Sequence, residues 1–196
     1  MLSLLPMTFL ALGTTAALLP RIDGVKILST SSTGPGCPSG SIRETLSSSG
    51  EVLLIGYSAF QAYSGNSIPA TEASKDCTVN IQLSHPSGYQ FRVVESTYRG
   101  YAALDAGAKA PISSSYRFTN TDGGPHAKTE VQPAGALNGV YTGTGKSAEN
   151  SAFSSCSPDK AGLEVSSKLS LTRPAGGKDS EFGLDDQEIR LVWRKC

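Results

Sequence analysis

Four widely spaced cysteines constrain the fold of this chain more than any other feature of its sequence. They are Cys37, Cys77, Cys156 and Cys196, and the last of them is the final residue. Cysteines that hold a metal usually occur in close CxxC-type pairs, and the sequence contains no such pair. We therefore expect two disulfides, no metal and no cofactor, in a protein that folds where disulfides persist.

An apolar leader precedes the first cysteine. Residues 2–12 are mostly apolar, and the small residues of the segment 13–17 follow them, which is the order of an h-region and a signal-peptidase site. We expect a signal peptide over residues 1–17, with cleavage near Ala17; the alternative is a buried N-terminal helix. No later segment approaches the roughly 18 apolar residues that span a bilayer. The mature chain, residues 18–196, is expected to be a single secreted, extracellular domain without a membrane span.

The composition disfavours nucleic acid as a partner. The chain has 17 Lys and Arg residues against 17 Asp and Glu residues, and no basic run could follow a phosphate backbone. It contains 21 glycines, and only 17% of its residues are charged. Such a composition is typical of short strands and turns rather than long charged helices. We expect a monomer whose partner is an extracellular protein or a cell-wall polysaccharide.

Alternation of apolar and polar residues indicates where the strands lie. The segment 77–83 alternates, and the pattern resumes at Tyr89 after a turn that contains Pro, Ser and Gly. The segments 163–171 and 189–193 alternate in the same way. We predict a β-hairpin from each of these two pairs. Weaker strand candidates are Val25–Leu28, Ser41–Leu46, Val52–Tyr57, Tyr98–Leu104, Ser114–Phe118 and Val140–Thr142.

These patterns predict an all-β protein. About eight short, half-buried strands separated by turn residues favour an antiparallel β-sandwich. If the strands run up and down in this layout, Cys37 lies at the same end of the sheet as Cys77, and Cys156 lies beside Cys196. We therefore favour the pairs Cys37 with Cys77 and Cys156 with Cys196 over the two other connectivities that four cysteines allow.

Several stretches of the chain resemble a known family. These stretches are Gly36–Pro38, Asp76–Leu83 with its continuation Pro86–Phe91, Tyr98–Tyr101 and the closing Val192–Cys196. In them the chain resembles the secreted, mainly fungal family labelled domain of unknown function 4360. The resemblance covers nearly the whole mature chain, except for a Gly-, Ala- and Ser-rich variable region at about residues 121–151. It implies a small extracellular β-rich protein of fungal source, and it brings no catalytic residues.

No motif indicates catalysis. A hydrolytic triad needs a base, and the only histidines, His85 and His126, are expected to lie in exposed loops. No GxSxG motif accompanies either of them. A glycosidase would need two facing carboxylates, whereas the carboxylates here are scattered along the chain. We therefore assign no catalytic residue and favour a protein that is not an enzyme.

One segment is a candidate for binding. Tyr98, Arg99 and Tyr101 bring together two aromatic rings and a cation, a combination that stacks on sugars or anchors protein interfaces. The alternative is that Tyr98 or Tyr101 fills the space between the sheets and that Gly100 marks a close backbone approach. Three functions follow as hypotheses. The first is an effector-like host-interaction protein that acts outside the fungal cell, the second a carbohydrate-binding or cell-wall-associated module, and the third an extracellular hydrolase.

Overall fold

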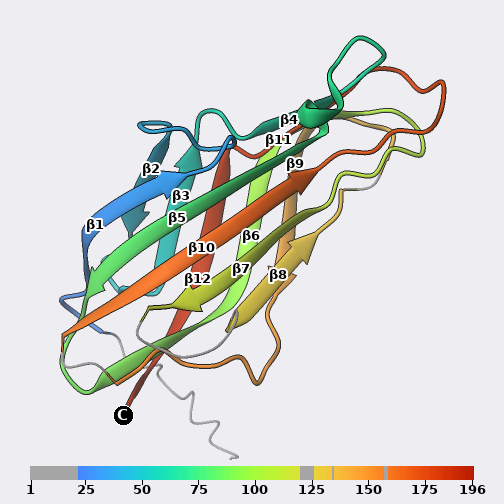
Figure 1. Cartoon of the computed structure of the whole chain (residues 1–196). Coiled ribbons are helices and arrows are strands. Elements are labelled where there is room, and N and C mark those ends of the chain that lie inside the picture. Colours follow the sequence, from blue (N-terminus) through green and yellow to red (C-terminus); the bar gives the residue numbers. More distant parts are fainter. Residues whose placement is uncertain (1–21, 120–125, 134, 157–158) are drawn as a thin grey trace, which may run out of the picture.

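The protein is built from two antiparallel β-sheets that face each other, as Figure 1 shows. The computed structural model describes residues 22–119, 126–133, 135–156 and 159–196, so the leader at residues 1–17 lies outside the described residues. Sheet A has five strands in the order β1-β5-β10-β7-β8. Sheet B has seven: six in the order β2-β3-β12-β6-β11-β4, and β9, which pairs with β6. The all-β, sandwich-like fold expected from the sequence is confirmed.

The strands vary widely in length. Sheet A consists of β1 (Lys26–Thr33), β5 (Ser74–Ser84), β10 (Lys160–Ser170), β7 (Ile112–Phe118) and β8 (Ala127–Val131). Sheet B consists of β2 (Ile42–Leu46), β3 (Val52–Tyr57), β12 (Asp186–Lys195), β6 (Tyr89–Leu104), β11 (Ser180–Gly183), β4 (Gln61–Ser64) and β9 (Leu137–Lys146). A short 3-10 helix, η1 (Ala70–Ala73), precedes β5. Among the helices of the described residues, none has the length and apolar character needed to cross a membrane.

Alternation located most of these strands. β5 buries Cys77, Val79, Ile81 and Leu83, as its pattern predicts, and β3 has the predicted bounds. The described residues contain twelve strands rather than about eight, because the short strands β4, β8 and β11 were not predicted. β8 lies within the region of residues 121–151, where β9 is also longer than the predicted segment 140–142. Short edge strands have too few residues to show a clear period.

Both predicted hairpins are wrong. β5 pairs with β1 and β10 in sheet A, whereas β6, which follows it in sequence, pairs with β12 and β9 in sheet B. The turn at residues 85–88 therefore crosses from one sheet to the other. β10 and β12 also belong to different sheets. Alternation shows which side of a strand is apolar, but it does not identify the strand's neighbour, and two facing sheets bury both apolar sides equally well.

Two disulfides connect segments that are far apart in the sequence. Cys37, in the connection from β1 to β2, is bonded to Cys77 in β5, with a Cα–Cα distance of 5.3 Å. Cys156, before β10, is bonded to Cys196 after β12, with a Cα–Cα distance of 6.0 Å. These are the pairs favoured from the sequence. The second pair joins the segment before β10 of sheet A to the end of β12 of sheet B, so it does not lie within one hairpin.

The space between the sheets has an aromatic part and a polar part. In the aromatic part, the rings of Phe91 and Phe118 lie 5.1 Å apart, and those of Phe91 and Trp193 lie 4.8 Å apart. In the polar part, Gln187 of β12 is fully buried. Its Oε1 accepts hydrogen bonds from Tyr57 at 3.1 Å and Ser167 at 3.2 Å. Its Nε2 donates to Ser114 at 3.1 Å and to Tyr116 at 2.9 Å, so one side chain connects both sheets.

Candidate functional site

The predicted binding segment of β6 is divided between the two sides of sheet B. Tyr98 is fully buried, and its hydroxyl is hydrogen-bonded to Thr129 of β8. It therefore cannot touch a ligand at the surface, and its expected binding role is corrected to a core role. Arg99 and Tyr101 lie on the opposite side of the strand, because successive side chains of a strand alternate. The structure brings these two residues together, on the outer face of sheet B.

Gly100 lies between these two residues for a packing reason. A Cβ atom at this position would lie 2.1 Å from the backbone oxygen of Gly183, where the chain leaves β11. The close backbone approach suggested by the sequence is therefore present. Any larger residue at position 100 would force the backbone of β6 away from Gly183.

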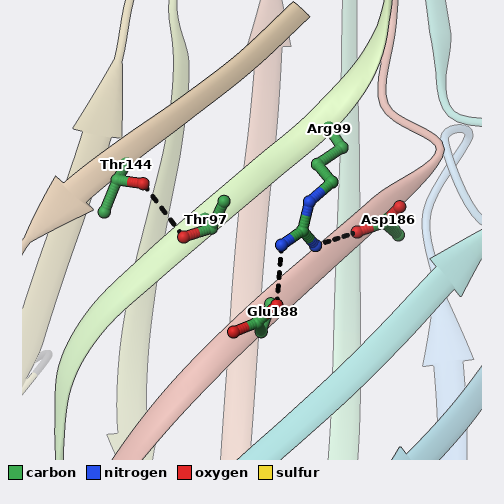
Figure 2. A network of polar contacts seen from close by, with 5 residues as sticks. All are labelled: Thr97, Arg99, Thr144, Asp186 and Glu188. Atoms are coloured by element: carbon green, nitrogen blue, oxygen red, sulfur yellow. Dashed lines mark hydrogen bonds and ion pairs between the residues drawn. The ribbon is translucent and has the colours of Figure 1, made fainter.

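Arg99 is held by two carboxylates, as Figure 2 shows. Its guanidinium lies 2.7 Å from Glu188 and 2.8 Å from Asp186, both on the neighbouring strand β12. These two hydrogen bonds raise the pKa of the guanidinium above its ordinary value. Beside them, the hydroxyls of Thr97 and Thr144 lie 3.0 Å apart across β6 and β9. The charges in this part of sheet B are thus satisfied by one another.

Tyr101 belongs to a small apolar patch at the β9 edge. It is 39% exposed, its hydroxyl donates to Asn138 at 2.7 Å, and it stands directly opposite Val140, which is 84% exposed. A hollow of about 330 Å³ adjoins Val140 and is also lined by Val131, Pro133 and Leu137. We call Tyr101, Val140 and this hollow the edge patch.

The outer face of sheet A carries a larger depression. A groove of about 670 Å³ is lined by β5, β10, β7 and β8 and by Lys146 at the end of β9. The strand register places outward side chains side by side in rows that run across the strands. We call the first of these the hydroxyl row, which consists of Thr33, Thr78, Ser166, Ser115 and Lys128. Within it, the hydroxyls of Thr78 and Ser166 lie 3.2 Å apart.

A second row in the groove carries charge. We call it the charged row, which consists of Asp76, Lys168, Ser113 and Glu130. Its carboxylates and ammonium are exposed, as are Lys128 and Lys146 beside it. In the part of the chain that the structure describes, none of these five charged side chains has an ion-pair partner. They are therefore available to a ligand, unlike Arg99.

The residues beneath the groove belong to the buried hydrogen-bond network around Gln187. Ser114 and Ser167 belong to the same strands as the groove residues but point inward, where their hydroxyls lie 2.7 Å apart and both bond to Gln187. A bonded core beneath the rows holds the two central strands, β7 and β10, in fixed positions. The groove residues are thus presented by a preformed surface.

Both histidines lie in connections between strands, as expected, but neither is fully exposed. His85 is only 5% exposed, and its ring lies 5.5 Å from that of Trp193. The ring of His126 stacks on Phe118 at 5.1 Å, and its Nδ1 accepts a hydrogen bond from the backbone N–H of Phe118. Both imidazoles therefore pack against aromatic side chains. Among the described residues, no three His, Cys, Asp or Glu side chains gather as a metal site would require.

Sequence reasoning missed the groove entirely. The polar half of each alternating pattern was visible, for example Thr78 in β5 and Ser166 in β10. Without the strand order, however, nothing showed that these residues are neighbours. The useful signal was that the outward positions of β5, β7 and β10 are hydroxyls, amides and charges with no aromatic among them.

Comparison with known proteins places the chain in a family without an assigned activity. Residues 23–196 match the family model described as Domain of unknown function (DUF4360). A relative from Arthroderma benhamiae, named an uncharacterized secreted protein, is 28% identical over 184 residues, which are 90% of this chain and 74% of the relative.

Solved structures give weaker similarities. The module TmCBM61 in complex with β-1,4-galactotriose covers 86% of this chain and 90% of its own, with 9% identity and a TM-score of 0.27. A family 11 carbohydrate-binding module from Clostridium thermocellum covers 86% and 96%, with 9% identity and a TM-score of 0.24. At these TM-scores, neither similarity bears on what this chain binds.

Proposed function

We propose that this chain, which belongs to the family of domain of unknown function DUF4360, binds polysaccharide outside the cell in the groove of sheet A. The protein is secreted, in agreement with its relative and its two disulfides. The observation that carries the proposal is the groove itself. It gathers hydroxyls and unpaired charges from four strands on one preformed surface.

The chemistry of the groove suits a ligand rich in hydroxyl groups. A sugar hydroxyl both donates and accepts hydrogen bonds, and the groove offers partners for both roles. Lys128 and Lys168 donate, Asp76 accepts, and the serine and threonine hydroxyls do either. Hydrogen bonds to charged groups contribute about 1.5–3 kcal/mol each, against about 1 kcal/mol for neutral ones. Free charges in the groove are therefore its strongest contacts.

The mode of binding differs from the stacking expected at Tyr98 and Tyr101. The groove is lined without an aromatic ring, so the ligand is held by hydrogen bonds along its edge. Each such contact contributes little, which favours a polymer that makes several contacts at once over a single sugar.

Retention on insoluble polysaccharides tests the proposal. The oxidised protein is mixed with cellulose, chitin and β-glucan, and the fraction that sediments is measured. Retention of the Ser166→Ala/Lys168→Ala variant is expected to be roughly tenfold weaker, because two central contacts are lost. The matched control is Ser31→Ala/Lys195→Ala, which removes the same groups outside the groove and is expected to bind as the wild type does. Equal retention of both variants, or none by the wild type, would refute the proposal.

A protein partner is the second candidate, and the edge patch favours it. Val140 is the most exposed large apolar side chain of the described residues, and it adjoins Tyr101 and an apolar hollow. Aromatic and aliphatic side chains of this kind anchor protein interfaces. An effector-like role in contact with a host would use this patch. Val140→Asp would then abolish binding of a purified host protein and leave polysaccharide retention unchanged.

We propose no hydrolytic function. A general base must reach the proton that it removes, and His85 is buried beside Trp193. His126 is engaged with Phe118 through its ring and its Nδ1. Substitution of either residue is expected to affect folding rather than turnover.

A further inference from the structure

The rows of the groove have a regular spacing. The hydroxyl row takes one side chain from each of five hydrogen-bonded strands of sheet A, in register; four of them line the groove, and Thr33 of β1 continues the row beyond it. Neighbouring strands lie about 4.8 Å apart, so the row extends roughly 19 Å across the sheet. The charged row runs parallel to it, two residues further along each strand. A ligand that crosses the strands therefore meets the same kind of contact once per strand.

The spacing between neighbouring side chains of the row favours one kind of polysaccharide. Successive sugars in a flat, extended β-1,4-linked glycan are separated by nearly the distance between neighbouring strands. We propose, building on the polysaccharide function above, that the groove binds an uncharged β-1,4-linked glycan that crosses the strands with about one sugar per strand. Coiled α-linked glycans do not keep this repeat and would lose contact with part of the row.

The opposite orientation fits less well. Side chains on one face of a strand recur about every 6.6 Å, which exceeds the rise per sugar. The groove is also bounded along the strands, because Arg117 and Glu164 form an ion pair at 2.7 Å directly beyond the hydroxyl row. A glycan lying along β7 and β10 would have to displace this pair. The glycan that crosses the strands avoids it.

The charges of the groove favour an uncharged ligand. Asp76 and Glu130 stand at the two ends of the charged row, and Lys168 stands between them. A polyanion would be repelled by Asp76 at one end, and a polycation would be repelled by Lys168 and by Lys128 and Lys146, which outnumber Glu130 at the other end. Uncharged hydroxyls can bond to both kinds of group. The ligand class is therefore a neutral glycan.

A series of soluble oligosaccharides tests the inference. Binding of β-1,4-linked glucose and N-acetylglucosamine oligomers, from the dimer to the hexamer, is measured by titration calorimetry. Affinity is expected to rise with length and to level off at about five sugars, the number of strands in the row. Maltohexaose, the α-1,4-linked counterpart, is expected to bind roughly tenfold more weakly.

Variants at different points of the row give a sharper test. Lys128→Ala, at one end, is expected to weaken the hexamer and leave the trimer nearly unchanged. Ser166→Ala, in the middle, is expected to weaken every oligomer. Ser31→Ala, on the same face outside the row, is the control, and a circular dichroism spectrum of each variant shows that it has folded.

The outcomes separate the inference from the proposed function. If the protein is retained on insoluble polysaccharide but binds α- and β-linked oligomers equally, or shows no dependence on length, the inference is wrong and the function stands. If it binds neither insoluble polysaccharide nor any oligomer, both are wrong. If Lys128→Ala weakens the dimer as much as the hexamer, the ligand does not run along the row.

Discussion

The two outer faces of the sandwich use charge in opposite ways. On sheet B, Arg99 is neutralised by Asp186 and Glu188 at hydrogen-bond distance. On sheet A, Lys168 stands beside Asp76 in register, yet neither is in an ion pair within the described chain. On sheet B these three charges are paired with one another. The other face offers its charges to whatever enters the groove, which is why we assign the ligand to sheet A.

The faces also differ in shape. The groove of sheet A has a volume of about 670 Å³, whereas the edge patch of sheet B adjoins a hollow of about 330 Å³. The groove of sheet A therefore combines unpaired charges with the larger of these two hollows. Four substitutions or conditions should affect the two faces differently or remove both.

Alkaline pH should unfold the protein and thereby remove both outer faces at once. Tyr57, Tyr98 and Tyr141 are buried, and burial raises the pKa of each phenol above its ordinary value near 10. The unfolded chain therefore releases these protons at a lower pH than the folded chain does. The free energy of unfolding that the protonated, buried tyrosines contribute is fully present below about pH 10 and is lost as the pH rises further.

Tyrosinate absorbance and circular dichroism, recorded together during an alkaline titration, check this expectation. Ionisation of the buried tyrosines should coincide with loss of the β-sheet signal. Ionisation of all tyrosines in a protein that keeps its fold would contradict it.

Gly100→Ala should damage sheet B most severely. The new Cβ would lie 2.1 Å from the Gly183 oxygen, a backbone atom that cannot turn aside. We expect a loss of about 3 kcal/mol in the free energy of unfolding, as is typical of overpacking. Urea denaturation measures this loss. Gly56→Ala is the matched control in the same sheet, because its nearest atom lies at 3.7 Å, and a similar loss in the control would refute the packing argument.

Gln187→Leu should remove the hydrogen bonds that connect the two sheets and lower the stability. The substitution removes the hydrogen-bond partner of the buried Tyr57 hydroxyl and two donors to sheet A. Leaving such groups unsatisfied is expected to reduce the free energy of unfolding by about 2 kcal/mol. Thermal and urea unfolding check this value, with Arg190→Gln, an exposed change on the same strand, as the control. A stability equal to that of the wild type would show that the network is dispensable.

Arg99→Gln and Lys168→Ala should have the smallest effects on stability, and only the second should weaken binding. Both residues are at the surface, where an ion pair contributes less than about 1 kcal/mol. Arg99→Gln is expected to leave polysaccharide retention unchanged, and Lys168→Ala is expected to reduce it. The reverse result in the sedimentation assay would move the binding site to sheet B.

The sequence predicted the buried side of each strand well, but it predicted poorly which strands pair with each other. The alternation in β5 identified its buried side, and the same alternation in β12 places Gln187 inward with Ile189 and Leu191. That inward glutamine was the available sign of a buried polar network. The hairpin partners were wrong, because a turn of a few residues can return to the same sheet or cross to the other. His85 was expected to be exposed for its turn residues, but Trp193 covers it.

The secreted compartment, the family and the all-β fold class were all predictable from the sequence. Cysteine spacing and strand periodicity are local properties, and they are readable without knowing which segments meet. The tertiary structure was needed to show that Tyr98 lies in the core while Tyr101 lies at the surface, and that Thr78, Ser166 and Ser115 stand in one row. A binding surface on a sheet depends on strand order and register, which arise from contacts between residues far apart in the chain.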